Sequence, residues 1–109
     1  MSNKLTMRDQ TDLSEQDRDA EGEELKAREH RRRELDDLKW LMAHPQGRRI
    51  VARLLDETGT QRSSFNHSGS VMAFNEGKRN VGLWITAEVL EAAPKGYFKL
   101  LEEFKGNDD

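Results

Sequence analysis

The sequence predicts an all-α fold, a small helical domain of about three to four helices with a long, highly charged N-terminal helix. Two observations lead to this expectation. From Leu35 onward, apolar residues recur at the spacing that places them on one face of a helix. The only two prolines, Pro45 and Pro94, stand where one such helix ends and the next begins.

The composition allows one domain with a small core. The chain has 109 residues, of which 34% are hydrophobic and 36% are charged. It has no cysteine, which excludes disulfides and cysteine-ligated metal sites and indicates a reducing compartment. Because the sequence contains no membrane segment and begins without an apolar signal region, we expect a protein made in the cytoplasm. A net charge of -3 gives no general attraction to nucleic acid.

The first third of the chain is rich in charge and poor in large apolar side chains. We expect residues 1–13 to be disordered and residues 14–34 to form a charged helical extension that begins near Ser14. Acidic residues precede basic ones in this stretch, an order that complements the helix macrodipole. The pair Glu24 and Arg28 also has the favourable i,i+4 orientation.

The apolar part of the chain begins where this charged stretch ends. We assign a helical domain to residues 35–105, followed by a short tail at residues 106–109. The first helix should end near His44, because Pro45 disfavours helical dihedral angles in the residue before it. The last turns of this helix carry an apolar stripe: Leu35, Leu38, Leu41 and Met42.

The second helix should run from Pro45 to Glu57. Gly59 then suits the left-handed position that terminates helices. The polar connection over residues 60–69 contains one aromatic residue, Phe65, which we expect to pack into the core. We expect the buried face of this helix to consist of Ile50, Val51, Leu54 and Leu55.

Two further helices complete the predicted domain. The third should extend from about Ser70 to Ala92 or Ala93, where Pro94 stops it. Its expected apolar face comprises Phe74, Val81, Ile85 and Val89, widened by Leu83, Trp84 and Leu90, with Trp84 interpreted as a core residue. A short final helix over residues 94–105 offers Tyr97, Phe98, Leu100, Leu101 and Phe104.

The sequence gives no indication of catalysis. Its three histidines, His30, His44 and His67, lack the spacing of two metal ligands on one helical turn. Neither serine of the Ser63-Ser64 pair lies in a nucleophile elbow. We therefore expect a protein that is not an enzyme and has no catalytic residues, no metal site and no cofactor.

Glycines beside basic pairs are the most informative feature of the second half. A helical glycine costs about 1 kcal/mol relative to alanine, so it indicates close packing or a docking surface. We assign Gly47, Gly77 and Gly82 to helix packing. Trp40 lies opposite the leucine stripe, which makes it a candidate anchor for a partner. The full set of predicted partner-binding residues is Trp40, Arg48, Arg49, Arg62, Phe65, Lys78, Arg79 and Asn80.

The basic residues among these have three possible roles. They could converge on a phosphate backbone, bind a protein partner, or pair with nearby carboxylates such as those of Asp56 and Glu76. We favour carboxylates or a protein, because few aromatic residues lie among the basic ones and the net charge is negative. Nucleic-acid binding in genome packaging or regulation remains the alternative. A weaker third hypothesis is a host-directed inhibitor whose acidic run, Asp9 to Glu24, imitates nucleic acid.

Three motifs follow one another in the second half of the chain: Trp40-Leu41 with Pro45-x-Gly47-Arg48-Arg49, then Arg62-Ser63-Ser64-Phe65, then Phe74-x-Glu76-Gly77-x-Arg79-Asn80-Val81-Gly82. This order resembles a small, poorly characterised domain family of short-tailed bacteriophages (podoviruses), over about residues 35–104. The resemblance implies a virion or morphogenesis protein without known catalysis. On this basis we expect a structural or assembly protein, made in the host cytoplasm and present in the virion. It would dock on a head, portal or internal (ejection) component, as a homo-oligomer or in several copies on a ring-shaped partner.

Overall fold

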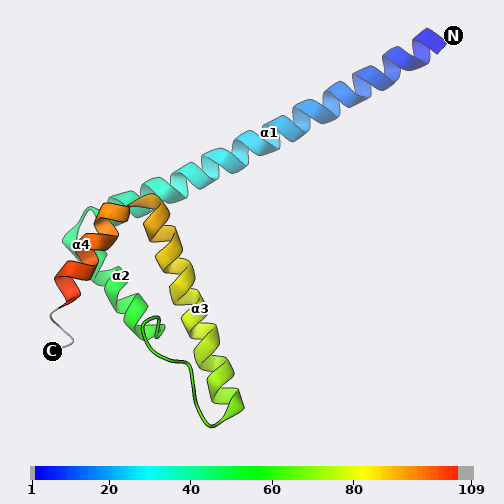
Figure 1. The fold of residues 1–109 in the computed structure, drawn as a ribbon. Helices are drawn as coiled ribbons and strands as arrows, with labels where there is room; N and C mark the ends of the chain where they lie inside the picture. The colour runs from blue at the N-terminus through cyan, green and yellow to red at the C-terminus, as the bar shows by residue number, and fades with distance from the viewer. Residues whose placement is uncertain (1, 106–109) are drawn as a thin grey trace. The chain divides into compact units, whose positions relative to one another are not determined.

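The computed structural model describes the backbone of residues 2–105 and the side chains of residues 14–105. This part contains four helices and no strand: α1 (Ser2–Met42), α2 (Pro45–Glu57), α3 (Gly69–Ala92) and α4 (Pro94–Phe104) (Figure 1). The predicted all-α fold with a long N-terminal helix is thus confirmed. The predicted tail at residues 106–109 lies outside the described residues.

The chain divides into two units, Met1–Glu34 and Leu35–Asp109. In the first unit, none of the described side chains of residues 14–34 is buried, as expected for a stretch dominated by charge. Helix α1 begins at Ser2, whereas we expected disorder up to residue 13. Residues 2–13 contain neither proline nor glycine, so no strong helix breaker separates them from the charged helix.

The helix boundaries of the second unit follow local sequence signals. Pro45 lies in the first turn of α2, and Gly59 after its end has a φ of 67°. The backbone N–H of Val71 donates to the Ser68 hydroxyl at 3.4 Å, which caps the start of α3. Pro94 opens α4. Helix α2 has the predicted bounds, and α3 and α4 each differ from the prediction by one residue.

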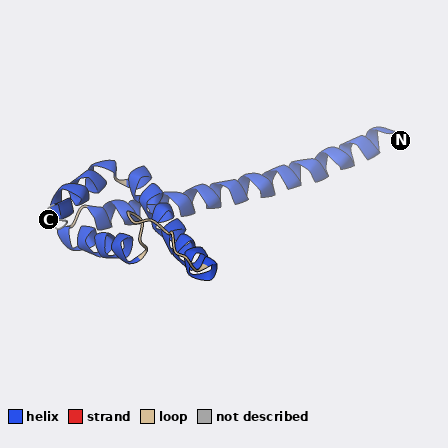
Figure 2. Cartoon of the chain, turned by 60° about the horizontal axis from the view of Figure 1, so that its bottom comes forward, coloured by secondary structure: helices blue, strands red, loops and turns tan. Residues whose placement is uncertain are grey.

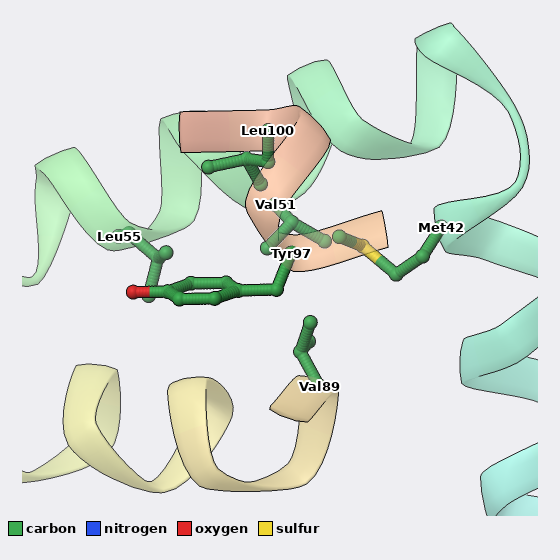
Figure 3. Close-up of a cluster of buried hydrophobic side chains, with 6 residues drawn as sticks. All are labelled: Met42, Val51, Leu55, Val89, Tyr97 and Leu100. Atoms are coloured by element: carbon green, nitrogen blue, oxygen red, sulfur yellow. The ribbon is translucent and has the colours of Figure 1, made fainter. Parts of the chain in front are cut away.

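The core lies where α2, α3 and α4 contact one another and meet the end of α1. Figure 3 shows its side chains pointing toward one another from all four helices. Its members are few, as the composition predicted: Met42, Val51, Leu55, Val89, Tyr97 and Leu100.

Two glycines allow the end of α1 to approach its neighbours closely. A Cβ atom at Gly47 would overlap the carbonyl oxygen of Leu41. A Cβ atom at Gly96 in α4 would lie 2.9 Å from the Cβ atom of Met42. The absence of side chains at both positions therefore brings α2 and α4 against the last turn of α1. Gly47 was assigned to helix packing from the sequence, whereas Gly96 was missed.

The two glycines of α3 that we assigned to helix packing differ in their surroundings. A Cβ atom at Gly82 would overlap the hydroxyl groups of Thr58 and Thr60, which lie in the connection after α2. At Gly77, no atom outside the surrounding backbone of α3 lies within 4 Å of the position of a Cβ atom. Gly77 therefore has no packing role inside the described part of the chain.

Several apolar residues that we placed in the core are exposed. On α2, Val51 and Leu55 are buried, but Ile50 and Leu54 lie on its outer flank and are about half exposed. On α3, all buried residues come from Gly82 onward. The reason is length: α3 has 24 residues, whereas α2 has 13 and α4 has 11, so they cannot cover all of it.

The connection between α2 and α3, residues 58–68, has no helix (Figure 2). The expectation that Phe65 packs into the core from this connection is wrong, because its side chain is exposed. Its ring instead lies edge-on to that of His67, with 5.6 Å between the ring centroids. The polar residues around it hold the connection through local hydrogen bonds, such as the one from Ser68 N–H to Asn66 Oδ1 at 2.9 Å.

Candidate functional site

Arg48 is a buried structural residue of the domain. It lies on the same face of α2 as Val51 in the core, so its side chain points inward and is only 6% exposed. Its Nε donates to Glu103 Oε1 at 2.6 Å, and its Nη1 donates to the carbonyl oxygen of Met42 at 2.9 Å. Arg48 thus joins α2 to α4 and caps the end of α1. Its predicted role as a partner-binding residue does not fit this burial.

Two other predicted arginines form ion pairs within the chain. Arg62 Nη1 lies 3.3 Å from Asp56 Oδ1, and its Nη2 donates to the Asp56 carbonyl oxygen at 2.7 Å. Arg79 Nη1 lies 3.5 Å from Glu76 Oε1. The Ser64 hydroxyl donates to the other oxygen of Glu76, which ties the connection to α3. Both carboxylates are among those that we considered as partners for these arginines.

The basic residues converge only in part. Arg62 and Arg79 line one shallow hollow together with residues 60, 61, 63 and 64. Arg48 lies elsewhere, because its guanidinium is engaged by Glu103 on α4. The ion pairs of Arg62 and Arg79 with carboxylates of their own chain weaken the attraction of this hollow for phosphate.

The remaining predicted polar residues lie at the surface. Arg49, Lys78 and Asn80 are all exposed. The ammonium nitrogen of Lys78 lies 5.7 Å from the centroid of the Phe74 ring, within the range of a cation–π interaction. Lys78 therefore lies along α3 over an exposed aromatic ring.

Aromatic side chains make up much of the exposed apolar surface. Five of the seven aromatic residues are more than half exposed: Trp40 (66%), Phe65 (68%), Phe74 (67%), Trp84 (63%) and Phe98 (58%). The exposure of Trp40 agrees with its position opposite the leucine stripe, and its ring lies 4.7 Å from that of His44. The core position predicted for Trp84 is wrong. The signal that was missed is that the large apolar residues of α3 are distributed around the helix, so that a domain of this size cannot bury all of them.

A groove of about 940 Å³ lies between α2 and α4. Its apolar wall includes Leu55, Tyr97, Phe98, Leu101 and Phe104, and charged residues lie around it. Sequence reasoning did not identify this groove, because it did not establish how the apolar residues of the last helix pack against α2.

Comparison with known protein families identifies the domain that carries these features. A family model described as Bbp19-like phage protein matches residues 38–102, which is more than half of the chain. The chain belongs to the Bbp19-like phage protein family. No curated protein and no solved structure matches it. The predicted phage family is therefore confirmed, while an origin in a short-tailed phage and a place in the particle remain predictions.

The Bbp19-like region includes all five exposed aromatic residues and the ion-paired residues Arg62 and Arg79, and it leaves out the charged residues 14–34. Among the side chains that the structure describes, no group of three or more His, Cys, Asp or Glu residues gathers in a way that could hold a metal ion. None of the described helices combines the length and the apolarity that crossing a membrane requires.

Proposed function

We propose that this Bbp19-like protein is a non-enzymatic structural or assembly protein of the phage particle, which docks on a larger head, portal or internal ejection component. The observation that supports this proposal is the exposure of five aromatic side chains on a domain with only seven buried hydrophobic residues among those described. Aromatic residues are enriched at protein interfaces and dominate their binding energy. A domain with so small a core gains stability when a partner covers such residues.

The groove between α2 and α4 is the contact that we assign to this partner. Its floor contains Leu55 and Tyr97 of the core, and Phe98 and Leu101 stand exposed along it. Charged residues, among them Arg62, surround the apolar floor. An apolar floor with a polar rim is the usual construction of a protein interface, and an amphipathic helix of a partner would fill it.

Mass spectrometry of purified particles tests the proposal. We expect this chain in the particle at a fixed number of copies relative to its partner. A phage that encodes Phe98→Glu should lose the chain from its particles, because a carboxylate would be buried in an apolar groove. Lys99→Gln is the matched control: it changes the net charge by the same amount at the next residue of α4, which does not line the groove. Particles without the wild-type chain would refute the proposal.

The hollow shared by Arg62 and Arg79 is the observation that would favour the alternative, a nucleic-acid-binding adaptor in packaging or regulation. That function predicts DNA binding at about 0.15 M salt, with an affinity that falls steeply as salt rises. It also predicts weaker binding after Arg62→Ala or Arg79→Ala. The assembly function predicts no binding under these conditions.

A further inference from the structure

Four residues of α3 form an exposed apolar stripe that no other part of the domain covers. Phe74, Gly77, Val81 and Trp84 follow one another at spacings of three, four and three residues, so they lie along one side of the helix. We call them the α3 stripe. Its three large side chains are at least half exposed. Its glycine lies between them with open space around it.

Gly77 has no function in the isolated chain that accounts for it. Gly47, Gly82 and Gly96 each lie against atoms of their own chain that a Cβ atom would overlap or crowd. Gly77 has no such neighbour, yet a glycine in a helix interior costs about 1 kcal/mol relative to alanine. A helix that approaches closely from outside the chain would make use of the missing side chain.

We propose that the α3 stripe pairs with the same stripe of a second copy of this chain, with the two helices antiparallel. The stripe is symmetric about position 79, because Gly77 and Val81 lie two residues on either side of it and Phe74 and Trp84 lie five. A two-fold axis at this level places Val81 of each copy in the notch at Gly77 of the other. It also places Phe74 against Trp84 twice. This self-complementarity is what an isologous dimer requires, and it selects a second copy as the occupant.

The charges of this segment do not oppose the pairing. Between Phe74 and Trp84, no charged residue other than Lys78 lies on the side of α3 that carries the stripe; Glu88, one turn beyond Trp84, lies on that side. Glu76 and Arg79 lie on the opposite side and are paired with each other at 3.5 Å. Lys78 lies at the edge of the stripe, over the Phe74 ring. The centres of protein interfaces are likewise poor in charge.

The exposed area places this interface among the small ones, which are usually weak. An aromatic side chain offers about 150–250 Å² for burial, so each of Phe74 and Trp84 leaves about 100–150 Å² open at its observed exposure. With Val81 and the flanking alanines, each copy would bury about 500 Å², which is below the roughly 800 Å² per partner of a standard interface. We therefore expect a dissociation constant in the micromolar range.

Sedimentation velocity of the purified full chain tests the pairing, and it does so independently of any docking in the particle. We expect a monomer–dimer equilibrium that shifts over roughly 10–100 μM. Val81→Glu should abolish the dimer, whereas Leu83→Glu should leave it intact. Leu83 is the matched control because it is similarly exposed but lies on a different side of α3. A chain that stays monomeric at about 500 μM, or equal losses in the two variants, would overturn the proposal.

Filling the notch gives a second test that does not depend on a buried charge. Gly77→Leu meets open space in the monomer, so it should not lower the melting temperature of the dilute chain. It should weaken the dimer at least tenfold, because the leucine would occupy the space that Val81 of the other copy needs. If Gly77→Leu left the affinity of the dimer unchanged, Val81 of the other copy would not lie against Gly77.

The orientation is tested by cross-linking, because the natural chain has no cysteine. Ala73→Cys and Ala87→Cys are placed at exposed positions beside the stripe, and the two variants are mixed with a short bismaleimide. An antiparallel pair brings residue 73 of one copy near residue 87 of the other. We therefore expect cross-links in the mixture. Cross-links that form as readily in either variant alone would overturn the antiparallel register.

Discussion

The two ends of α3 differ in whether the rest of the domain buries their apolar side chains. At its C-terminal end, Val89 and Ala92 are buried against α2 and α4. At its N-terminal end, Phe74 and Val81 are just as apolar but exposed. The shorter neighbouring helices reach only the first of these regions. An apolar helix therefore indicates that its surface will be buried, but it does not indicate whether its own chain will bury it.

The difference between packed and open helix surface can be measured at two glycines, Gly47 and Gly77. Gly47 in α2 is packed against the end of α1, because a Cβ atom there would overlap the backbone of Leu41. Gly77 belongs to the open region, with no atom near the position of its Cβ. When each glycine is replaced by the same larger residue, only the glycine that packs within its own chain should lose stability in the monomer.

The largest effect is expected from Gly47→Val. A backbone carbonyl cannot move aside as a side chain can, so the free energy of unfolding should fall by about 3 kcal/mol or more. Gly77→Val is the matched control and should change it by no more than about 0.5 kcal/mol, because valine and glycine have similar helix propensities. Urea unfolding of dilute samples, followed by circular dichroism at 222 nm, measures both. Similar losses in the two variants would contradict the contrast between the regions.

The second-largest effect is expected at Arg48, the buried arginine of α2. Arg48→Met leaves Glu103 without its cation and the Met42 carbonyl without its donor. Removing one partner of a fully buried ion pair costs about 3–5 kcal/mol, and we expect about 2 kcal/mol because Glu103 is one-third exposed.

A double-mutant cycle checks that this loss comes from the pair. Glu103→Gln removes the charge of the acceptor, so Arg48→Met should cost less in that background than in the wild-type chain. Equal losses in both backgrounds would show that Arg48 acts through its packing or its bond to Met42, and not through Glu103.

The helix boundaries could be predicted from the sequence because they depend on residues that are neighbours in the chain. Pro45 and Pro94 set helix starts because the proline ring fixes φ and lacks an N–H, wherever the helix lies in the fold. Gly59 ends α2 with a positive φ for an equally local reason. The helices and their order, which depend on such signals and on helical spacing, were therefore predicted well.

Whether a side chain is buried or exposed depends on how the helices pack against one another. The spacing of apolar residues in the sequence does not determine that packing. Arg48 has the sequence context of an exposed cation, but it lies on the core face of α2. Trp84 has the context of a core residue, but no helix of the described chain reaches the side of α3 on which it lies. Gly96 was missed because its role depends on Met42, which is 54 residues away in sequence. These errors share one cause: the surroundings of each residue are set by helices that are distant in sequence.

A smaller effect of opposite sign is expected at the open glycine. Gly77→Ala should raise the free energy of unfolding of the monomer by about 1 kcal/mol, because alanine loses less backbone entropy in a helix and meets no neighbour here. The same substitution at Gly82 is the control within α3. It should lower stability, because its methyl group would overlap the hydroxyls of Thr58 and Thr60. The comparison fails if both substitutions change the urea midpoint in the same direction.

The smallest effect is expected at Arg79, where the two candidate functions diverge. Its pair with Glu76 is partly exposed and lies within one turn of α3, so Arg79→Met should change the free energy of unfolding by less than about 0.5 kcal/mol. A change as large as that of Arg48→Met would instead make Arg79 a structural residue. Because stability is unaffected, any loss in the variant reports a contact outside the chain. Loss of DNA binding would favour the nucleic-acid function, and loss of the chain from particles with no effect on DNA would favour docking on a phage protein.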